Sequence, residues 1–439
     1  MSNEVIGLVM LGAMVVAILV GFPISFTLIF LGIVFGYWGF EDLVFYLLVL
    51  TFNSTMMEQT LAAVPLFVFM GILMEQAQLM ERMFDAVQKL LFRVRGSLFL
   101  AVMFVATVFG AASGIVGASV TILGIMAGRL MIRSGYDVKL SSGLITAGGT
   151  LGILIPPSVM LVVMGPVMEV PVPQLLAAAV FPGLLLAVIF TAYAMVRCWI
   201  NPSLGPALPE ELRPTNMREV WRDFFFGLVP PTALMVAALG SIFFGLATPT
   251  EGAACGAFGA VLLTLLYGRL TLASLQDALI KTLEISVLIL FLVAASNFFG
   301  SVFARLGTPT MLTDYLISLE LSRYAFLALI MALIFVLGWP LEWVPIVLIV
   351  VPFLLPLVQK LQIDMTWFAV LIAVNLQTAW LSPPVALSAY FLKGVVPQWE
   401  LSDIYKGMLQ FMVLQVAGLI LIIVFPEIAL WLPRVMYGQ

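Results

Sequence analysis

The feature that most constrains this chain is a series of long uncharged apolar runs, which recur from one end of the sequence to the other. Runs such as 5–40, 140–168 and 407–426 contain no charged residue. A bilayer core about 30 Å thick needs about 20 apolar residues per spanning helix. Only 10% of the 439 residues are charged, against about 25% in soluble domains. We therefore predict an all-α polytopic membrane protein with roughly ten or more crossings and no sizeable soluble domain.

The composition excludes several kinds of active site. The chain has no histidine, so it has no imidazole metal ligands, His-dependent triads or His proton relays. Its two cysteines, Cys198 and Cys255, indicate no disulfide or metal framework. It also has no phosphate-binding loop of the form G-x-x-x-x-G-K-[ST], so any energy that it uses would come from an ion gradient or a partner. We expect no enzymatic activity, no cofactor and no nucleic-acid partner.

A first hairpin is predicted within residues 96–128, an uncharged block too long for one span and too short for two. Basic residues flank it on both sides, and the positive-inside rule places both flanks in the cytoplasm. Its centre, 110-GAASGIVGAS-119, is rich in small residues. We predict a re-entrant helical hairpin with its tip near Ser113–Gly117. The alternative is one long tilted helix in which Gly110 and Gly114 pack against a neighbour.

Two Pro-Pro pairs predict two broken helices. They lie in 148-GGTLGILIPPSVML-161 and 378-TAWLSPPVALS-388, each in the middle of an apolar run. Proline inside a helix costs about 3 kcal/mol or more and leaves backbone groups unpaired. The glycines of the first segment would let a ligand approach the freed backbone closely. A kink that only shapes packing is the alternative for either segment.

The two halves of the chain superimpose with a constant offset of 227, which places Pro156 on Pro383 and Asp137 on Asp364. A second block with few charged residues, 324–359, is centred on 338-GWPLEWVP-345. It starts from the opposite side of the membrane. The repeated order of hairpin, charged elbow and broken helix predicts an inverted-topology repeat. In such transporters the hairpin tips and broken helices meet near the midplane, where freed carbonyls bind cations.

Three charged features have less specific interpretations. Residues 77–95 carry an apolar stripe opposite a charged face, which predicts an interfacial amphipathic arm helix. Glu251 follows Pro249-Thr250, and we favour helix capping over a transport role for it. Glu342 lies at the predicted second tip, where it would attract a cation, bear on gating or be a solvated loop residue.

The segments 110-GAASGIVGASVTILG-124, 148-GGTLGILIPPSVM-160 and 248-TPTEGAA-254 resemble the large membrane subunit of the bacterial tripartite ATP-independent periplasmic (TRAP) transporters. The resemblance extends over the whole length, including 67-FVFMGILME-75 and 381-LSPPVALSAYFLKG-394. It implies an elevator-type, ion-transporter-like permease of the inner membrane that imports a small organic acid with Na⁺. It also implies two partners, a small membrane subunit of four helices and a soluble periplasmic substrate-binding protein.

The resemblance also implies binding residues. The first sodium site would use Ser113, Gly114, Gly149, Thr150 and Leu154. The second would use Gly338, Thr378 and Leu381. The substrate region would include Gly117, Ser119, Pro156, Pro157, Glu342, Ser382 and Pro383. The second tip departs from the pattern Gly-Met-Phe-Met-Asp of many relatives, because 338-GWPLE-342 keeps the acid but not the flanking residues. It resembles a subgroup linked to 2-oxo, hydroxy or aromatic acids, so specificity for sugar acids is not implied.

These features divide the chain into scaffold and transport segments. The expected segments are N-terminal scaffold helices (1–76), the arm (77–95), transport repeat 1 (96–170), scaffold helices with a cytoplasmic loop (171–282), a helix leading into repeat 2 (283–321), transport repeat 2 (322–398) and a C-terminal helix (399–439). A stand-alone sodium–dicarboxylate symporter, which needs no partner subunit, is the main alternative function. Two further alternatives are proton coupling through Glu342 or Glu251 and a passive channel.

Overall fold

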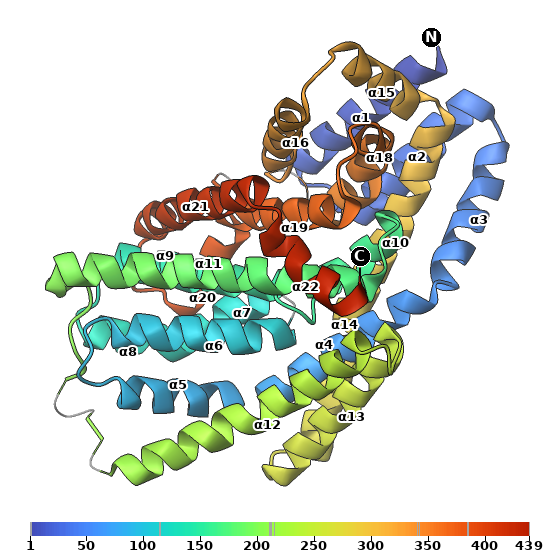
Figure 1. Cartoon of the computed structure of the whole chain (residues 1–439). Coiled ribbons are helices and arrows are strands. Elements are labelled where there is room, and N and C mark those ends of the chain that lie inside the picture. Colours follow the sequence, from blue (N-terminus) through green and yellow to red (C-terminus); the bar gives the residue numbers. More distant parts are fainter. Residues whose placement is uncertain are drawn as a thin grey trace.

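The structure is a computed structural model that describes residues 2–113, 116–209, 213–214, 216–339, 341, 343–383 and 386–438. Within these ranges every regular element is a helix, as Figure 1 shows. Nine segments of the described chain are helical, long and apolar enough to cross a membrane. They are Asn3–Val20, Gln59–Gln76, Val116–Arg133, Val172–Ile200, Met217–Phe243, Pro249–Leu266, Leu272–Arg305, Trp343–Lys360 and Leu401–Val424. The predicted all-α polytopic membrane fold is confirmed.

One group of helices packs around the long helix α14. These are α1 (Asn3–Val20), α2 (Ile24–Phe40), α3 (Leu43–Met56), η1 (Gln59–Ala62), α4 (Ala63–Gln76), α12 (Met217–Phe243), α13 (Pro249–Leu266) and α14 (Leu272–Arg305). Helices α2, α3 and α4 contact α14 directly, and α13 lies between α4 and α12. In Figure 1 this group forms the right-hand and lower edges of the molecule.

The amphipathic segment predicted over 77–95 contains helix α5 (Leu79–Leu90). Its apolar stripe is buried, including Leu79, Met83 and Phe84, while Glu81 and Arg82 are exposed. The stripe packs against α6 and α12, so protein rather than lipid covers this face. The helix therefore bridges the α14 group and the first hairpin, which is the placement that a connecting arm requires.

The two segments predicted as transport repeats contain helices in the same order. Repeat 1 contains α6 (Ser97–Ser113), α7 (Val116–Leu123), η2 (Gly124–Gly128), α8 (Arg129–Arg133), α9 (Val138–Thr150), η3 (Leu151–Ile153) and α10 (Val159–Val167). Repeat 2 contains α16 (Arg323–Leu337), α17 (Trp343–Pro345), η6 (Ile346–Val350), α18 (Val351–Lys360), α19 (Met365–Leu381) and α20 (Leu387–Val395). The remaining helices are α11 (Val172–Ile200), η4 (Pro202–Leu204), α15 (Thr308–Ser318), α21 (Leu401–Val424) and α22 (Glu427–Tyr437).

The offset of 227 residues between the two halves also relates the residues that cap the helices. It takes Val138 at the start of α9 to Met365 at the start of α19. The preceding residues, Asp137 and Asp364, both cap their helices. Asp137 Oδ1 accepts a hydrogen bond from the Leu140 amide at 2.7 Å, and Asp364 Oδ1 accepts one from the Trp367 amide at 2.8 Å. Each cap satisfies one of the unpaired amides of a helix N-terminus. The two elbows are thus built in the same way.

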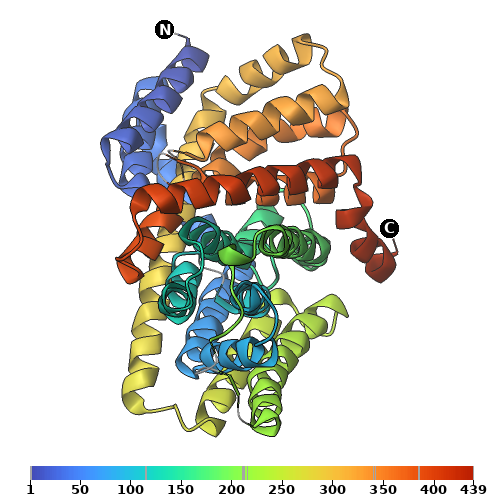
Figure 2. The same ribbon diagram turned by 90° about the vertical axis from the view of Figure 1, so that its left-hand side faces the viewer.

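Two long helices cover the broken helices. Helix α21 packs against both α9 and α19, and α11 contacts α9, α10, α19 and α21. Figure 2 shows α21 (red) running across the molecule between the orange helices of repeat 2 and the teal and green helices of residues 97–200. The C-terminal segment, expected as one helix, holds two, because Pro426 disfavours helical backbone at the residue before it.

The helix containing Glu251 begins with the predicted cap. Thr248 Oγ1 accepts a hydrogen bond from the Glu251 amide at 3.3 Å, and Glu251 Oε2 accepts one from the Thr248 amide at 2.8 Å. This reciprocal pair is a capping box at the start of α13. The capping interpretation of Glu251 is confirmed.

The capping box predicts how variants of Glu251 behave. Glu251→Ala is expected to lower the stability of the folded protein slightly, because one cap acceptor and one favourable charge are lost. Glu251→Gln keeps an acceptor and is the matched control. Thermal unfolding in detergent gives the stability, and uptake per folded molecule is expected to be unchanged in both variants. Loss of uptake in a stable Glu251→Gln protein would instead assign the carboxylate a transport role.

Candidate functional site

The first helix break lies in the buried centre of repeat 1. Helix α9 ends at Thr150, and α10 begins only at Val159. Between them the Pro156–Pro157 peptide is cis. Ser158 bridges the break, because its Oγ donates to the Ile153 carbonyl at 2.5 Å and accepts from the Leu161 amide at 3.4 Å. The predicted break is present, and a hydroxyl satisfies part of the backbone that it frees.

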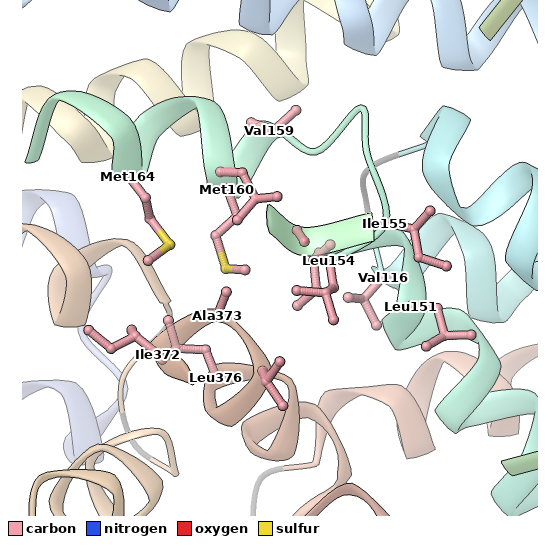
Figure 3. Close-up of a cluster of buried hydrophobic side chains, with 14 of the residues drawn as sticks. Val116, Leu151, Leu154, Ile155, Val159, Met160, Met164, Ile372, Ala373 and Leu376 are labelled. Atoms are coloured by element: carbon pink, nitrogen blue, oxygen red, sulfur yellow. The ribbon is translucent and has the colours of Figure 1, made fainter. Parts of the chain in front are cut away.

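Apolar side chains enclose this break. Figure 3 shows Leu154 of the break and Met160 of α10 beside Ala373 and Leu376 of α19, with Ile155 on the side of Val116 and Leu151. All of these side chains are buried. Polar groups near the break are therefore held in a water-poor environment, where an electrostatic contact is stronger than in water.

The glycines at the first break face hairpin 1. A Cβ atom added to Gly152 would lie 2.5 Å from the carbonyl oxygen of Gly110 in α6. One added to Gly149 would lie 3.1 Å from the backbone nitrogen of Val120 in α7. The sequence suggested that these glycines admit a ligand to the freed backbone. In the structure the backbone of α6 and α7, the predicted hairpin 1, occupies that space. The glycines therefore allow the hairpin to pack closely against the first break.

The second break brings together the residues expected at the second sodium site. Helix α19 ends at Leu381, and α20 begins at Leu387. Thr378 Oγ1 donates to the Asn375 carbonyl at 2.6 Å, and Ser382 Oγ donates to the Thr378 carbonyl at 2.7 Å. A Cβ atom added to Gly338 would lie 2.9 Å from Cβ of Ala379, the residue after Thr378. The end of α16 thus touches the last turn of α19.

The two broken helices meet through a pair of glutamines. Gln377 Nε2 of α19 donates to the carbonyl of Thr150, the last residue of α9, at 3.2 Å. Gln415 Nε2 of α21 donates to Gln377 Oε1 at 2.5 Å and to the Val374 carbonyl at 3.0 Å. Thr150, Gln377 and Gln415 are completely buried. Gln377 is also the residue that the offset of 227 places on Thr150.

The structure groups most of the predicted site residues around these breaks. Gly149, Thr150 and Leu154 lie at the first break, and Gly117 of α7 packs against the ring of Phe391 in α20. Ser119 is buried within α7, and the remaining described residues, at or beside the breaks, are Pro156, Pro157, Gly338, Thr378, Leu381, Ser382 and Pro383. Gly114, Glu342 and the side chain of Ser113 lie outside the described residues.

The donors available for a cation are carbonyl and hydroxyl oxygens. In the part of the chain that the structure describes, no group of three or more His, Cys, Asp or Glu residues is placed to hold a metal ion. Hard cations accept backbone carbonyls and hydroxyls as ligands. Thr150 and Thr378 contribute a hydroxyl each, and these hydroxyls donate to the carbonyls of Ala147 and Asn375 in their own helices. This donor set fits a singly charged hard cation such as Na⁺.

Sequence reasoning missed a polar cleft between the α14 group and the repeats. One cavity of about 360 Å³ is lined by Ser54, Thr55 and Glu58 from α3 and its flank, by Asn297 of α14, and by residues of α10, η6 and α18. A neighbouring cavity of about 650 Å³ shares Ser54 and Asn297. Asn297 Nδ2 donates to Thr55 Oγ1 at 3.0 Å. The available signal was the polar run 53-NST-55 within an apolar helix.

Comparison with known proteins gives a consistent result along the whole chain. A family model described as "Tripartite ATP-independent periplasmic transporter, DctM component" matches residues 11–428. The chain is 31% identical over 436 residues to the sialic acid TRAP transporter large permease protein SiaM of Vibrio cholerae, covering 95% of this chain and 97% of that one. It is 30% identical over 380 residues to the C4-dicarboxylate TRAP transporter large permease protein DctM of Pseudomonas aeruginosa, covering 85% and 86%.

Two further similarities concern partners and fold. The isethionate TRAP transporter permease protein DctMQ of Oleidesulfovibrio alaskensis is 28% identical over 374 residues, and the match covers only 57% of its length. Among solved structures, the YdaH transporter of Alcanivorax borkumensis aligns with a TM-score of 0.61 at 16% identity, covering 90% of this chain and 88% of that one. At that identity the likeness concerns the fold alone.

Proposed function

Because this chain belongs to the TRAP transporter family as a large permease subunit, a multi-pass protein of the bacterial inner membrane, we propose that it imports a small organic acid in symport with Na⁺. The acid is delivered by a periplasmic binding protein, and a small four-helix membrane subunit completes the permease. The family consists of transporter subunits rather than enzymes.

One observation carries the proposal of ion coupling. The Gln377–Thr150 hydrogen bond joins the last turns of α19 to the first break, and each break contacts a helix of its own predicted hairpin. Freed carbonyls and helix ends in a dry environment favour small ions, which satisfy backbone groups that the breaks leave without helical partners. Sodium site 1 then uses Ser113, Gly114, Gly149, Thr150 and Leu154, and site 2 uses Gly338, Thr378 and Leu381.

We propose an elevator movement of the inverted repeats. The mobile part contains both hairpins and both broken helices, together with α21. It also includes α11, which the sequence analysis assigned to the scaffold, because both long helices pack against the broken helices. The α14 group is the scaffold, and α5 is the arm between them. The polar cleft at Ser54, Thr55 and Asn297 lies where α3 and α14 face α10 and α18, so it lines the surface along which the two parts slide. Its hydroxyl and amide groups would solvate a polar solute crossing that surface.

The substrate is proposed as a carboxylic or related acid. Relatives are named for C4-dicarboxylates, sialic acid and isethionate, which are all organic acids. The tip 338-GWPLE-342 resembles a subgroup linked to 2-oxo, hydroxy or aromatic acids, and on that resemblance we propose such an acid rather than a sugar acid. The partner subunit is proposed from the tripartite family description and from relatives longer than this chain, such as DctMQ.

Reconstituted uptake tests this function. Proteoliposomes holding this chain and its small subunit are given the binding protein and radiolabelled organic acids, with an inward gradient of Na⁺ or of K⁺ as the matched control. Uptake is expected only with Na⁺ and all three proteins. Uptake driven equally well by a proton gradient without Na⁺ would identify a proton-coupled variant. Uptake by this chain alone would contradict the tripartite assignment and indicate an independent symporter.

A further inference from the structure

The Gln377–Thr150 hydrogen bond joins two residues that occupy equivalent positions in the predicted repeats. These two positions are separated by the repeat offset of 227. Apolar side chains also pack between the two broken helices, and this hydrogen bond is the one polar side-chain link between α9 and α19 in the described part of the chain.

The Gln377–Thr150 hydrogen bond supplies a partner for a carbonyl at the end of helix α9 that has no donor within the helix. In a continuing α-helix the Leu154 amide would donate to the Thr150 carbonyl, but it donates to the Leu151 carbonyl at 3.0 Å instead. The side chain of Gln377 supplies a donor in its place. The orientation of the Thr150 carbonyl, beside Gly149, therefore depends on a residue of the opposite repeat.

The amide of Gln377 is held in one orientation. Its Oε1 accepts from Gln415 Nε2, which is anchored a second time on the Val374 carbonyl. Exchanging the oxygen and nitrogen of Gln377 would set an acceptor against the Thr150 carbonyl and a donor against the Gln415 donor. The chain of donors thus fixes which atom faces the first break.

Stability alone does not account for this arrangement. Gln415 Oε1 is buried and accepts no hydrogen bond from the described residues. Leaving a buried acceptor unpaired is unfavourable, and an apolar side chain of similar shape would avoid it. A glutamine at this position therefore indicates a role beyond packing, namely holding Gln377.

We propose that Gln377, held by Gln415, is a positioning residue that couples the two sodium sites. This inference rests on the proposed sodium symport. Gln377 directly precedes Thr378 of site 2 and fixes the carbonyl of Thr150 of site 1, so a cation that orders one break also orders the other. Such coupling is reciprocal, since each site raises the affinity of the other by the same factor. Uptake then depends on sodium in a sigmoidal manner.

Sodium titration of near-isosteric variants tests the coupling. Gln377→Met removes the donor at similar volume, and Gln415→Met removes the side chain that holds it. Uptake at increasing Na⁺ is expected to show a Hill coefficient approaching 2 in the unsubstituted protein and about 1 in both variants. Asn375→Leu is the matched control, because Asn375 Nδ2 donates to the Met331 carbonyl of α16 at 2.7 Å, within repeat 2. It is expected to lose stability but keep the Hill coefficient.

Thermal stabilisation by Na⁺ in detergent provides a second readout that needs no transport, and its sodium dependence is expected to change in the same way. If Gln377→Met does not fold, the Gln415→Met titration decides. An unchanged Hill coefficient in the folded variants, or a coefficient of 1 in the unsubstituted protein, would overturn the coupling while leaving sodium symport intact. Uptake without any sodium dependence would overturn the proposed function itself.

Discussion

Replacing Gly407 by alanine is expected to destabilise the protein and abolish uptake. Gly407 lies where α21 crosses α9, and a Cβ atom there would be 2.1 Å from the carbonyl oxygen of Lys139 and 2.9 Å from the amide nitrogen of Gly143. Both are backbone atoms, which cannot move aside unless the two helices separate. Overpacking in a well-packed interior costs typically about 1–3 kcal/mol, and this contact belongs at the upper end.

Gly418→Ala on the same helix is the matched control for Gly407→Ala. A Cβ atom at Gly418 would meet the end of the Leu186 side chain at 2.5 Å, and a leucine side chain can rotate away. Alanine also favours helix over glycine by roughly 1 kcal/mol, which offsets this adjustment. Thermal unfolding in detergent and uptake per folded molecule distinguish the two variants. Equal stabilities would show that α9 and α21 are not in such close contact.

Gly152→Ala is the second substitution with a large expected effect. The added methyl group would lie 2.5 Å from the Gly110 carbonyl oxygen, so α6 would have to move away from the first break. Because this contact sets the distance between hairpin 1 and the proposed sodium site 1, we expect at least a tenfold higher sodium concentration for half-maximal uptake, which corresponds to about 1.4 kcal/mol.

The control for Gly152→Ala is Gly394→Ala in α20, where an added Cβ atom meets nothing within 4 Å. That variant is expected to transport normally and to gain up to roughly 1 kcal/mol from the better helix propensity of alanine. Uptake measured over a range of Na⁺ concentrations separates a change of sodium affinity from a change of maximal rate. A Gly152→Ala protein with normal sodium dependence would show that the hairpin contact does not influence the ion site.

Local features of the sequence predicted the helix breaks, the cap at Glu251 and the amphipathic helix. Helix breaks follow from Pro156 and Pro157, because proline acts on its own turn. The cap at Glu251 was predicted from its place after Pro249-Thr250, whereas the caps at Asp137 and Asp364 were found in the structure, and all three are hydrogen bonds within three residues. The amphipathic α5 follows from the spacing of apolar residues along one helix. Family membership follows from short sequence motifs, and the comparisons confirm it.

The tertiary structure alone decided which residues meet. Gln377, Gln415 and Asn375 are uncharged amides in apolar runs, and nothing in their local sequence indicates a partner. Gln377 forms a hydrogen bond with Thr150 across a separation of 227 residues, and Asn297 forms one with Thr55 across 242 residues. The contacts of Gly149 and Gly152 with hairpin 1 likewise depend on how the hairpin and α9 cross. By itself the sequence determined the helices, their breaks and the repeat, because these depend on neighbours along the chain. Only the packing of the two repeats against each other decided where polar groups are paired in the buried centre, because those pairs join segments that local sequence does not relate.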